Sequence, residues 1–455
     1  MATTLFANGK FFTTPQGEGN DHDARFHECM LVENGIIQYV ARDDADLRAA
    51  AASKGAAVRD LDGSHVLPGF IDGHVHALLL GQSLQRLNLE RCQSLLEIRE
   101  MIKAYAASHP DAPRILCGGW MEFMTDGKAD VFMLDDLDPR PIYVVSRDLH
   151  SCWCNTAAID EMGLSSASNP VGGTIHRDAQ GRALGLLSEA ACTLLVWPHL
   201  AQIASPEERI GAIRDAFQAL HAVGCTGCVE MAMDDIAWDA LQTLRAEMGG
   251  QLPLHIAAHW LIRPTDSIDG DSEELTQAIA PSQRFNASTS PDFRIVGIKI
   301  MCDGVVDSAD RAGLQCALHA IGDAAAKLAI DALSQDGTPG RRHRVEHLEL
   351  TSPGDGARLA AAGITASIQP AHADPVLLKA WPELLGTARC GRAFAYGDFA
   401  ASGANISIGS DSPTAPWDVL RNLYTATTRR SSLLKAQVQE TWYKGKKVYD
   451  ASKTA

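Results

Sequence analysis

The chain has 455 residues, of which 46% are hydrophobic and 21% are charged, and its formal net charge is −16. This composition is typical of a soluble globular protein, and the length suits one large domain with an accessory unit or two to three smaller domains. The negative charge argues against binding to nucleic acid or anionic lipid, because both would be repelled.

The N-terminal segment has no basic region followed by an apolar stretch, so we expect no secretory signal. No part of the sequence approaches the roughly 20 uninterrupted apolar residues of a membrane helix. The 11 cysteines are scattered without the spacing of a disulfide framework, which predicts reduced thiols. Together these features predict a cytoplasmic protein.

The first sixty residues alternate short strand-like runs with turns. Asn-Gly pairs at 8–9 and 34–35 lie between apolar runs, and this dipeptide favours hairpin turns. The stretch 437–450 returns to strand character around a Lys-Gly turn. We therefore expect residues 1–65 and 433–455 to form one small β domain built from both chain ends.

Residues 66–432 repeat the order apolar run, turn and amphipathic helix, with runs such as PIYVVS, LPLHIAAHW, FRIVGIKIM, LQCALHAI, GITASIQP and NISIGSD. Strands that alternate with helices indicate parallel βα units and an α/β fold. Nearly continuous apolar strands fit a sheet that is buried on both faces. The segment VGGTIHRDAQGRALGLLSE breaks the alternation and predicts a β-hairpin insertion around residues 165–190.

Two histidines are set into the end of the run VLPGFIDGHVHALLL. His74 and His76 are two positions apart, so both imidazoles point to the same side of a strand. Such a pair can bind one divalent ion, and the alternative explanation is two hydrogen-bonded histidines in a loop.

Later apolar runs end in ionisable residues in the same way. In a (β/α) barrel the C-terminal strand ends meet on one face, where the catalytic loops lie. One such histidine would be explained by a hydrogen-bonded place in the core, but the repeated placement is hard to explain by packing. The residues concerned are Lys299, His319, His347 and Asp411.

The segment LPGFIDGHVH at 67–76 is similar to the first-strand signature of the amidohydrolase superfamily. The motifs GIKIMCDG, LHAIGD, RVEHLEL, SIQPAH and GSDSP resemble amidohydrolase family 3, which includes N-substituted formamide deformylases. The resemblance covers nearly the whole chain. It implies a TIM-like (β/α)8 barrel of the metal-dependent hydrolase type, and it implies that the small domain of both chain ends is a β-sandwich. It also implies hydrolysis of carbon–nitrogen bonds other than peptide bonds, as in amides or N-substituted formamides, by metal-activated water.

The resemblance also implies a role for each strand-end residue. Asp411 would bind a divalent metal, with zinc as the first expectation, and would accept the proton of the attacking water. The remaining metal ligands would be His74, His76, His319 and His347.

Lys299 matches the position at which superfamily members bridge two metals through a carbamylated lysine. A free ammonium repels a cation, so Lys299 can be a ligand only when it is modified or has lost its proton. Without that change the expectation is a single metal ion and an ion pair between Lys299 and Asp303.

Candidates for substrate contact are His150 and Trp153 in RDLHSCWCNT, Asp303 in GIKIMCDG, and His372 in SIQPAH. For His150, Trp153 and His372, lining the pocket and an ordinary structural role are equally compatible with the sequence. The partner predicted is a small-molecule substrate, without nucleic acid or membrane, and a homo-oligomer stays open.

Two places depart from the family's pattern. Only 11 residues run from Asp303 to Gly313, and TTRRSS at 427–432 leads directly into LLKAQVQETWYKGKKVYD, whereas relatives carry longer segments at both places. Two hypotheses follow from this departure. The chain is either an active hydrolase or a catalytically silent or poorly folded truncated isoform of one.

Overall fold

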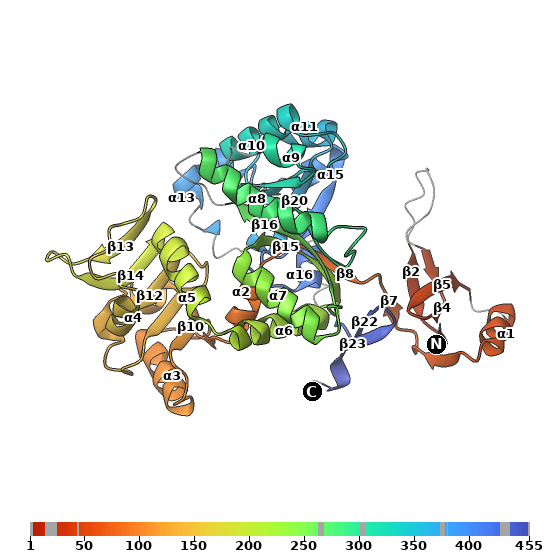
Figure 1. Ribbon diagram of the computed structural model, residues 1–455, viewed down its shortest axis with the longest axis horizontal. Helices are drawn as coiled ribbons and strands as arrows, with labels where there is room; N and C mark the ends of the chain where they lie inside the picture. The colour runs from red at the N-terminus through yellow and green to blue at the C-terminus, as the bar shows by residue number, and fades with distance from the viewer. Residues whose placement is uncertain are drawn as a thin grey trace.

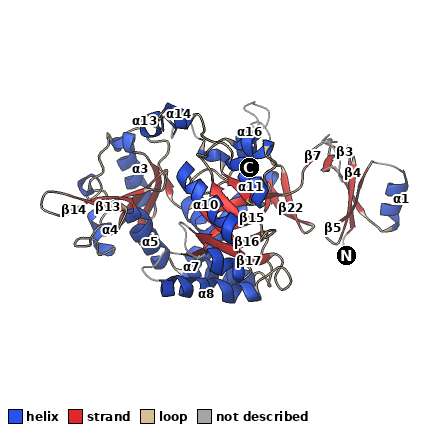
Figure 2. Cartoon of the chain, turned by 90° about the horizontal axis from the view of Figure 1, so that it is seen from above, coloured by secondary structure: helices blue, strands red, loops and turns tan. Residues whose placement is uncertain are grey.

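The computed structural model describes residues 3–13, 25–42, 45–262, 268–300, 306–373, 378–379, 381–427 and 437–453. A barrel occupies the centre, a separate sheet lies on one side of it, and the small sheets of the chain ends lie on the other (Figures 1 and 2). Within the described residues, no helix has the length and apolar character needed to cross a membrane.

The barrel consists of eight parallel strands that are neighbours in chain order. Val75, at the end of the first strand, forms a parallel bridge with Ser412 beyond the last strand, so the sheet closes on itself. This closure confirms the TIM-like barrel predicted from the sequence. The strands are β8 (Phe70–Val75), β15 (Cys225–Met233), β16 (His255–Ile262), β17 (Phe293–Ile300), β18 (Gln315–Ala320), β19 (Arg344–His347), β20 (Thr365–Ile368) and β21 (Ile406–Ile408).

Helices follow the barrel strands and cover the outside of the barrel (Figure 1). They include α2 (Ala77–Leu84), α6 (Pro206–Ala222), α7 (Asp235–Glu247), α8 (Ile268–Arg284), α10 (Asp323–Asp336), α11 (Asp355–Ala362), α15 (Tyr396–Ala401) and α16 (Val419–Thr427).

Helix α6 shows how the sequence fixes one of these elements. It begins with a capping box, in which Ser205 accepts a hydrogen bond from the amide of Glu208 and the Glu208 carboxylate accepts one from the amide of Ser205. Pro206 at the first helical position needs no amide hydrogen there. Ile213 and Phe217, four residues apart, face the barrel core, so that one side of the helix is buried.

The short connection after β17 leaves the strand order intact. Helix α9 (Val306–Arg311) lies in the crossover, and β17 and β18 are parallel neighbours. Ala309 of α9 is fully buried in the barrel core. The Asp310 carboxylate lies 3.1 Å from Nε2 of His343, and this contact ties the crossover to the segment before β19. Within the described residues, one short helix, α9, lies between these two strands.

Residues 87–189 hold a second sheet, six-stranded in the order β13-β14-β12-β11-β10-β9. The hairpin predicted as an insertion corresponds to β13 and β14 at one edge of this sheet. The run PIYVVS, predicted as a barrel strand, is β11 of this sheet instead, because an apolar run buried on both faces looks the same in either sheet. The strands are β9 (Leu87–Asn88), β10 (Ile115–Trp120), β11 (Ile142–Ser146), β12 (Ser151–Cys154), β13 (Gly173–Arg177) and β14 (Ala183–Glu189). Helices α3 (Leu95–Ser108), α4 (Thr156–Glu161) and α5 (Trp197–Ile203) pack on it. We call residues 87–203 the insertion lobe.

The two chain ends meet beside the barrel. The four-stranded N-terminal sheet contains β1 (Thr3–Ala7), β4 (Cys29–Glu33), β5 (Ile36–Ala41) and β6 (Ala57–Asp60). A three-stranded sheet joins β2 (Lys10–Thr13), β3 (Arg25–His27) and β7 (His65–Val66). The C-terminal hairpin consists of β22 (Glu440–Tyr443) and β23 (Lys446–Asp450).

The hairpin contacts both of its neighbours (Figure 1). The ring of Trp442 packs edge-on against Phe6 of the N-terminal sheet at 5.4 Å between centroids, and Arg59 pairs with Glu440. On the barrel side, the hydroxyl of Thr441 donates a 2.6 Å hydrogen bond to the carbonyl of His221 in α6.

Candidate metal centre

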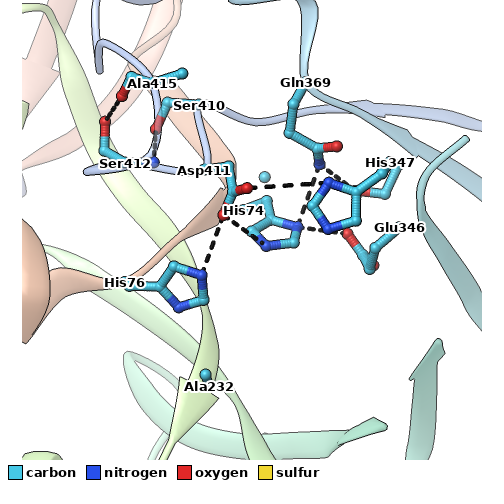
Figure 3. A network of polar contacts seen from close by, with 12 residues as sticks. His74, His76, Ala232, Glu346, His347, Gln369, Ser410, Asp411, Ser412 and Ala415 are labelled. Carbon is cyan, nitrogen blue, oxygen red and sulfur yellow. Dashed lines mark hydrogen bonds and ion pairs between the residues drawn. The ribbon is translucent and has the colours of Figure 1, made fainter. Parts of the chain in front are cut away.

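The end of β8 presents two imidazoles to one carboxylate oxygen. Nε2 of His74 lies 3.2 Å from Oδ1 of Asp411, and Nε2 of His76 lies 3.1 Å from the same atom (Figure 3). The spacing of two residues along the strand puts both rings on the same side of it, as the sequence pattern predicts. The structure therefore brings His74, His76 and Asp411 together.

Two more imidazoles approach the other oxygen of Asp411. Nε2 of His372 lies 3.3 Å from Oδ2, and Nδ1 of His347 lies 3.9 Å from it. Burial alone would raise the pKa of the Asp411 carboxyl. The charge of His74 and the hydrogen bonds of the surrounding imidazoles outweigh burial and hold this pKa well below its usual range. Asp411 is therefore an ionised carboxylate at neutral pH.

Two residues of this cluster have an unusual backbone conformation. Asp411 has φ +58° and His347 has φ +77°, which are left-handed conformations that residues other than glycine rarely adopt. Such strain costs of order 1–3 kcal/mol per residue and persists where the surrounding structure holds it. At Gly409 a β-carbon would lie 2.4 Å from the amide nitrogen of His74, so only glycine allows β21 to approach β8 this closely.

His319 and Lys299 complete the cluster from neighbouring strands. The rings of His319 and His347 are 4.4 Å apart between centroids, and those of His74 and His347 are 5.1 Å apart. Burial lowers the pKa of His319 to about 3, and the charge of Lys299 adds to this effect, so the imidazole is neutral and keeps a free lone pair. Lys299 is 2% exposed, and burial lowers the pKa of its ammonium group.

The donor set fits a divalent metal ion. Ligand atoms of His74, His347 and Asp411 lie within 4.8 Å of one another, and all three residues are buried. Nδ1 of His347 is buried and has no hydrogen-bond partner among the described residues. Imidazole nitrogens with a carboxylate oxygen are the ligands that zinc and related transition-metal ions prefer. Glu349 and His372 form a further donor group with His347.

Three buried glutamates behind the histidines were not predicted from the sequence. Oε2 of Glu346 lies 2.7 Å from Nδ1 of His74, and Oε1 of Glu349 lies 2.7 Å from Nδ1 of His372. Oε1 of Glu230 lies 3.9 Å from Nδ1 of His76. The signal that could have revealed Glu230 and Glu346 is an acidic residue inside an otherwise apolar strand run, because a buried carboxylate needs a partner.

The predicted substrate contacts fall in different places. His372 joins the cluster around Asp411. Trp153 is fully buried in the insertion lobe, where its indole nitrogen donates a 3.0 Å hydrogen bond to the carbonyl of Asp130. His150 is exposed on the same lobe and pairs with Glu189 at 2.8 Å. The structure therefore does not bring Trp153 and His150 to the cluster, and Asp303 lies outside the described residues.

Comparison with protein families and curated relatives finds proteins of similar sequence. The model of the amidohydrolase family matches residues 57–452. The chain is 27% identical to the protein LONG AFTER FAR-RED 3 of Arabidopsis thaliana, over 94% of this chain and 78% of the relative. It is 26% identical to the putative amidohydrolase YtcJ of Bacillus subtilis (strain 168), over 93% and 84% of the two chains. It is 24% identical to the N-substituted formamide deformylase of Arthrobacter pascens, over 89% and 80%.

Solved structures show the same fold. An uncharacterised metal-dependent hydrolase from Pyrococcus furiosus superposes with a TM-score of 0.73 at 21% identity, over 93% of this chain and 88% of that one. A second, from Pyrococcus horikoshii OT3, gives a TM-score of 0.74 at 19% identity, over 94% and 86%.

The family match covers the barrel, the insertion lobe and the C-terminal hairpin, and it includes every residue of the cluster around Asp411. The resemblance to amidohydrolase family 3 that the sequence motifs indicated is thereby confirmed. The chain belongs to the amidohydrolase family and is a metal-dependent hydrolase of carbon–nitrogen bonds.

Proposed function

We propose that the protein hydrolyses an amide or an N-substituted formamide of a small-molecule substrate, with Asp411 as the catalytic proton acceptor. The observation that carries this proposal is the convergence of His74, His76 and His372 within 3.3 Å of the Asp411 carboxylate. The N-substituted formamide deformylase relative, aligned over 89% of this chain, supports the substrate class.

The cofactor proposed is zinc. His74, His347 and Asp411 are the residues that would hold it, with His76 and His319 beside them. When bound, such an ion lowers the pKa of a water molecule to about 7 and polarises the carbonyl group of a substrate.

The chain's own groups supply the proton transfer. Asp411, ionised because its neighbours hold its pKa low, accepts a proton from the attacking water and returns it to the departing nitrogen. Burial would lower the pKa of His372, but its contacts with Asp411 and Glu349 raise that pKa to about 10. His372 is therefore cationic beside Asp411, and its positive charge would stabilise negative charge that develops on the substrate oxygen.

Lys299 is proposed to bridge two ions as a carbamate. In this modification the neutral amine adds carbon dioxide and releases one proton. Burial lowers the pKa of Lys299, which favours the neutral amine that the reaction needs. Protein equilibrated with 13C-labelled bicarbonate should then give a carbamate NMR signal that disappears in Lys299→Ala. Absence of that signal from the wild-type protein would leave a single-ion centre.

A cytoplasmic location remains part of the proposal. The ten cysteines within the described residues are free thiols, and nine of them are buried. Reduced, buried thiols are typical of a reducing compartment.

The test is elemental mass spectrometry on protein purified without chelator, together with a thermal melt and a screen of amides, N-substituted formamides and cyclic ureas. We expect one or two transition-metal ions per chain, a melt that falls when the metal is removed, and turnover of at least one formamide or amide. No metal, and a broad melt that added zinc does not sharpen, would instead support the silent, truncated isoform.

A further inference from the structure

His74 is held from behind by a buried carboxylate. Its Nδ1 lies 2.7 Å from Oε2 of Glu346, and its Nε2 faces Asp411 on the opposite side of the ring (Figure 3). His74 is 1% exposed and Glu346 is fully buried, so water does not take part in this contact. Because an ionised carboxylate can only accept a hydrogen bond, Nδ1 of His74 carries a ring proton, and Nε2 is the nitrogen that remains to bind a metal ion beside Asp411.

Arg344 keeps Glu346 in place and ionised. Nε of Arg344 donates to Oε1 of Glu346 at 2.7 Å, and Nη2 lies 3.2 Å from Oε2. This paired contact with a guanidinium, which keeps its charge, holds the carboxylate negative and fixes its orientation.

The same guanidinium ties Glu346 to the strand that carries His74. Nη2 of Arg344 donates to the carbonyl of Gly73 at 2.7 Å and to the hydroxyl of Ser367 at 2.7 Å. Gly73 directly precedes His74 in β8, whereas Arg344 and Glu346 belong to β19. Arg344 thus fixes the backbone next to His74 directly, and it fixes the ring of His74 through Glu346.

We infer that Glu346, clamped by Arg344, is a positioning residue that sets the tautomer and orientation of His74 for metal binding. It contacts neither substrate nor metal and acts only through the ring. This inference rests on the metal centre of the proposed function. Carboxylate partners of this kind commonly change metal affinity by about 10- to 100-fold.

His76 provides the contrast. Its Nδ1 is 3.9 Å from Oε1 of Glu230, beyond hydrogen-bond distance. Oε2 of Glu230 instead accepts a 2.6 Å hydrogen bond from the amide of Ala77. Of these two imidazoles, His74 is the one whose Nδ1, the nitrogen turned away from Asp411, is held by a carboxylate.

The experiment compares Glu346→Gln with the wild-type protein by chelator competition for zinc and by the absorption spectrum of the cobalt(II)-substituted protein. We expect the zinc dissociation constant to rise about 10- to 100-fold and the cobalt bands to change, because His74 no longer has a fixed tautomer. The matched control is Glu161→Gln in the insertion lobe, where the carboxylate also contacts an arginine and a histidine, Arg114 at 2.7 Å and His199 at 3.4 Å. This control should leave both readouts unchanged.

Zinc affinity and cobalt bands of Glu346→Gln equal to those of the wild-type protein would overturn the inference. An equal loss in Glu161→Gln would also overturn it, because the effect would then be general destabilisation. If Glu346→Gln does not fold because Arg344 is left unpaired, the double variant Arg344→Gln/Glu346→Gln removes both charges and gives the same two outcomes. A wild-type protein that binds no zinc would instead overturn the metal centre itself.

Discussion

The amide of Asp411 donates a 2.7 Å hydrogen bond to the carbonyl of His74. This bond joins the last barrel strand to the first at the point where both present a metal-ligand candidate. The contact that closes the barrel therefore also assembles the site. Any change that breaks the contact between the first and last strands should remove the metal as well as weaken the fold.

The double variant His74→Ala/His76→Ala should lose its metal and all hydrolysis, because both nitrogens facing Asp411 Oδ1 are removed. Elemental mass spectrometry should find less than about a tenth of the wild-type content. The control is His109→Ala/His176→Ala, two histidines of the insertion lobe with local partners only, which should keep the metal. Wild-type stoichiometry in the His74/His76 variant would refute the ligand assignment.

Asp411→Asn should keep a metal and lose turnover. The amide oxygen remains a ligand, but it cannot accept the proton of the attacking water. We expect kcat to fall by about 10²- to 10⁴-fold, the range typical of a lost general base. Equal turnover numbers for the two proteins at matched metal content would remove Asp411 from the proton transfer.

Gly409→Ala should destabilise the protein by about 3 kcal/mol and lower its metal content, because the new methyl group would lie 2.4 Å from the amide nitrogen of His74. Gly397→Ala is the control, since no atom lies within 4 Å of its added carbon and the position is helical. Urea unfolding of both variants measures the difference. Equal urea midpoints for the two variants would show that the contact between β21 and β8 tolerates a side chain at position 409.

His259 should make the protein sensitive to acid. Burial lowers the pKa of this histidine to about 3 in the folded protein, against an unfolded value near 6.5. The unfolded chain then binds more protons, so the stabilisation is complete above pH 6.5 and falls as the pH drops toward 3.

His259→Gln tests this linkage, because a neutral amide does not titrate. Between pH 7.5 and 5 the wild-type protein should lose about 2 kcal/mol more stability than the variant. Chemical denaturation at both pH values gives the difference, and contributions shared by the two proteins cancel. Parallel profiles of stability against pH for the two proteins would show that His259 does not cause the acid sensitivity.

The chain ends should behave as one unit, as the predicted β-sandwich of residues 1–65 and 433–455 requires. Trp442→Ala removes the ring between Phe6 and Arg59 and should cost about 2 kcal/mol. It should also make both ends more sensitive to protease, whereas the barrel stays protected. If cleavage rates stay unchanged at both ends, the hairpin and the N-terminal sheet are independent.

The ligand strands were predictable from the sequence because each combines a continuous apolar run with a polar end. This pattern can be read from the sequence alone. In the folded chain, the barrel brings the ends of β8, β18 and β19 together. The sheet to which PIYVVS belongs was not predictable, since burial on both faces does not distinguish a barrel strand from a strand of the insertion lobe.

The partner of the positioning carboxylate could not be predicted from the sequence. Glu346 and His347 are adjacent, and a regular strand would turn them to opposite faces. Their joint presence in the cluster depends on the positive φ of His347 and on contacts with β8, 272 positions away from Glu346. Pairings at that separation leave no spacing signal in a single sequence.

Helix α2 leads from His76 directly into the insertion lobe, where β9 begins three residues after the helix ends. At Gly81 an added β-carbon would lie 1.8 Å from the carbonyl oxygen of Ala212, so the backbones of α2 and α6 are in direct contact. The helix is thus moored to the barrel wall before the chain departs. Because this contact fixes α2 directly after His76, changes within the lobe should leave the position of His76 undisturbed.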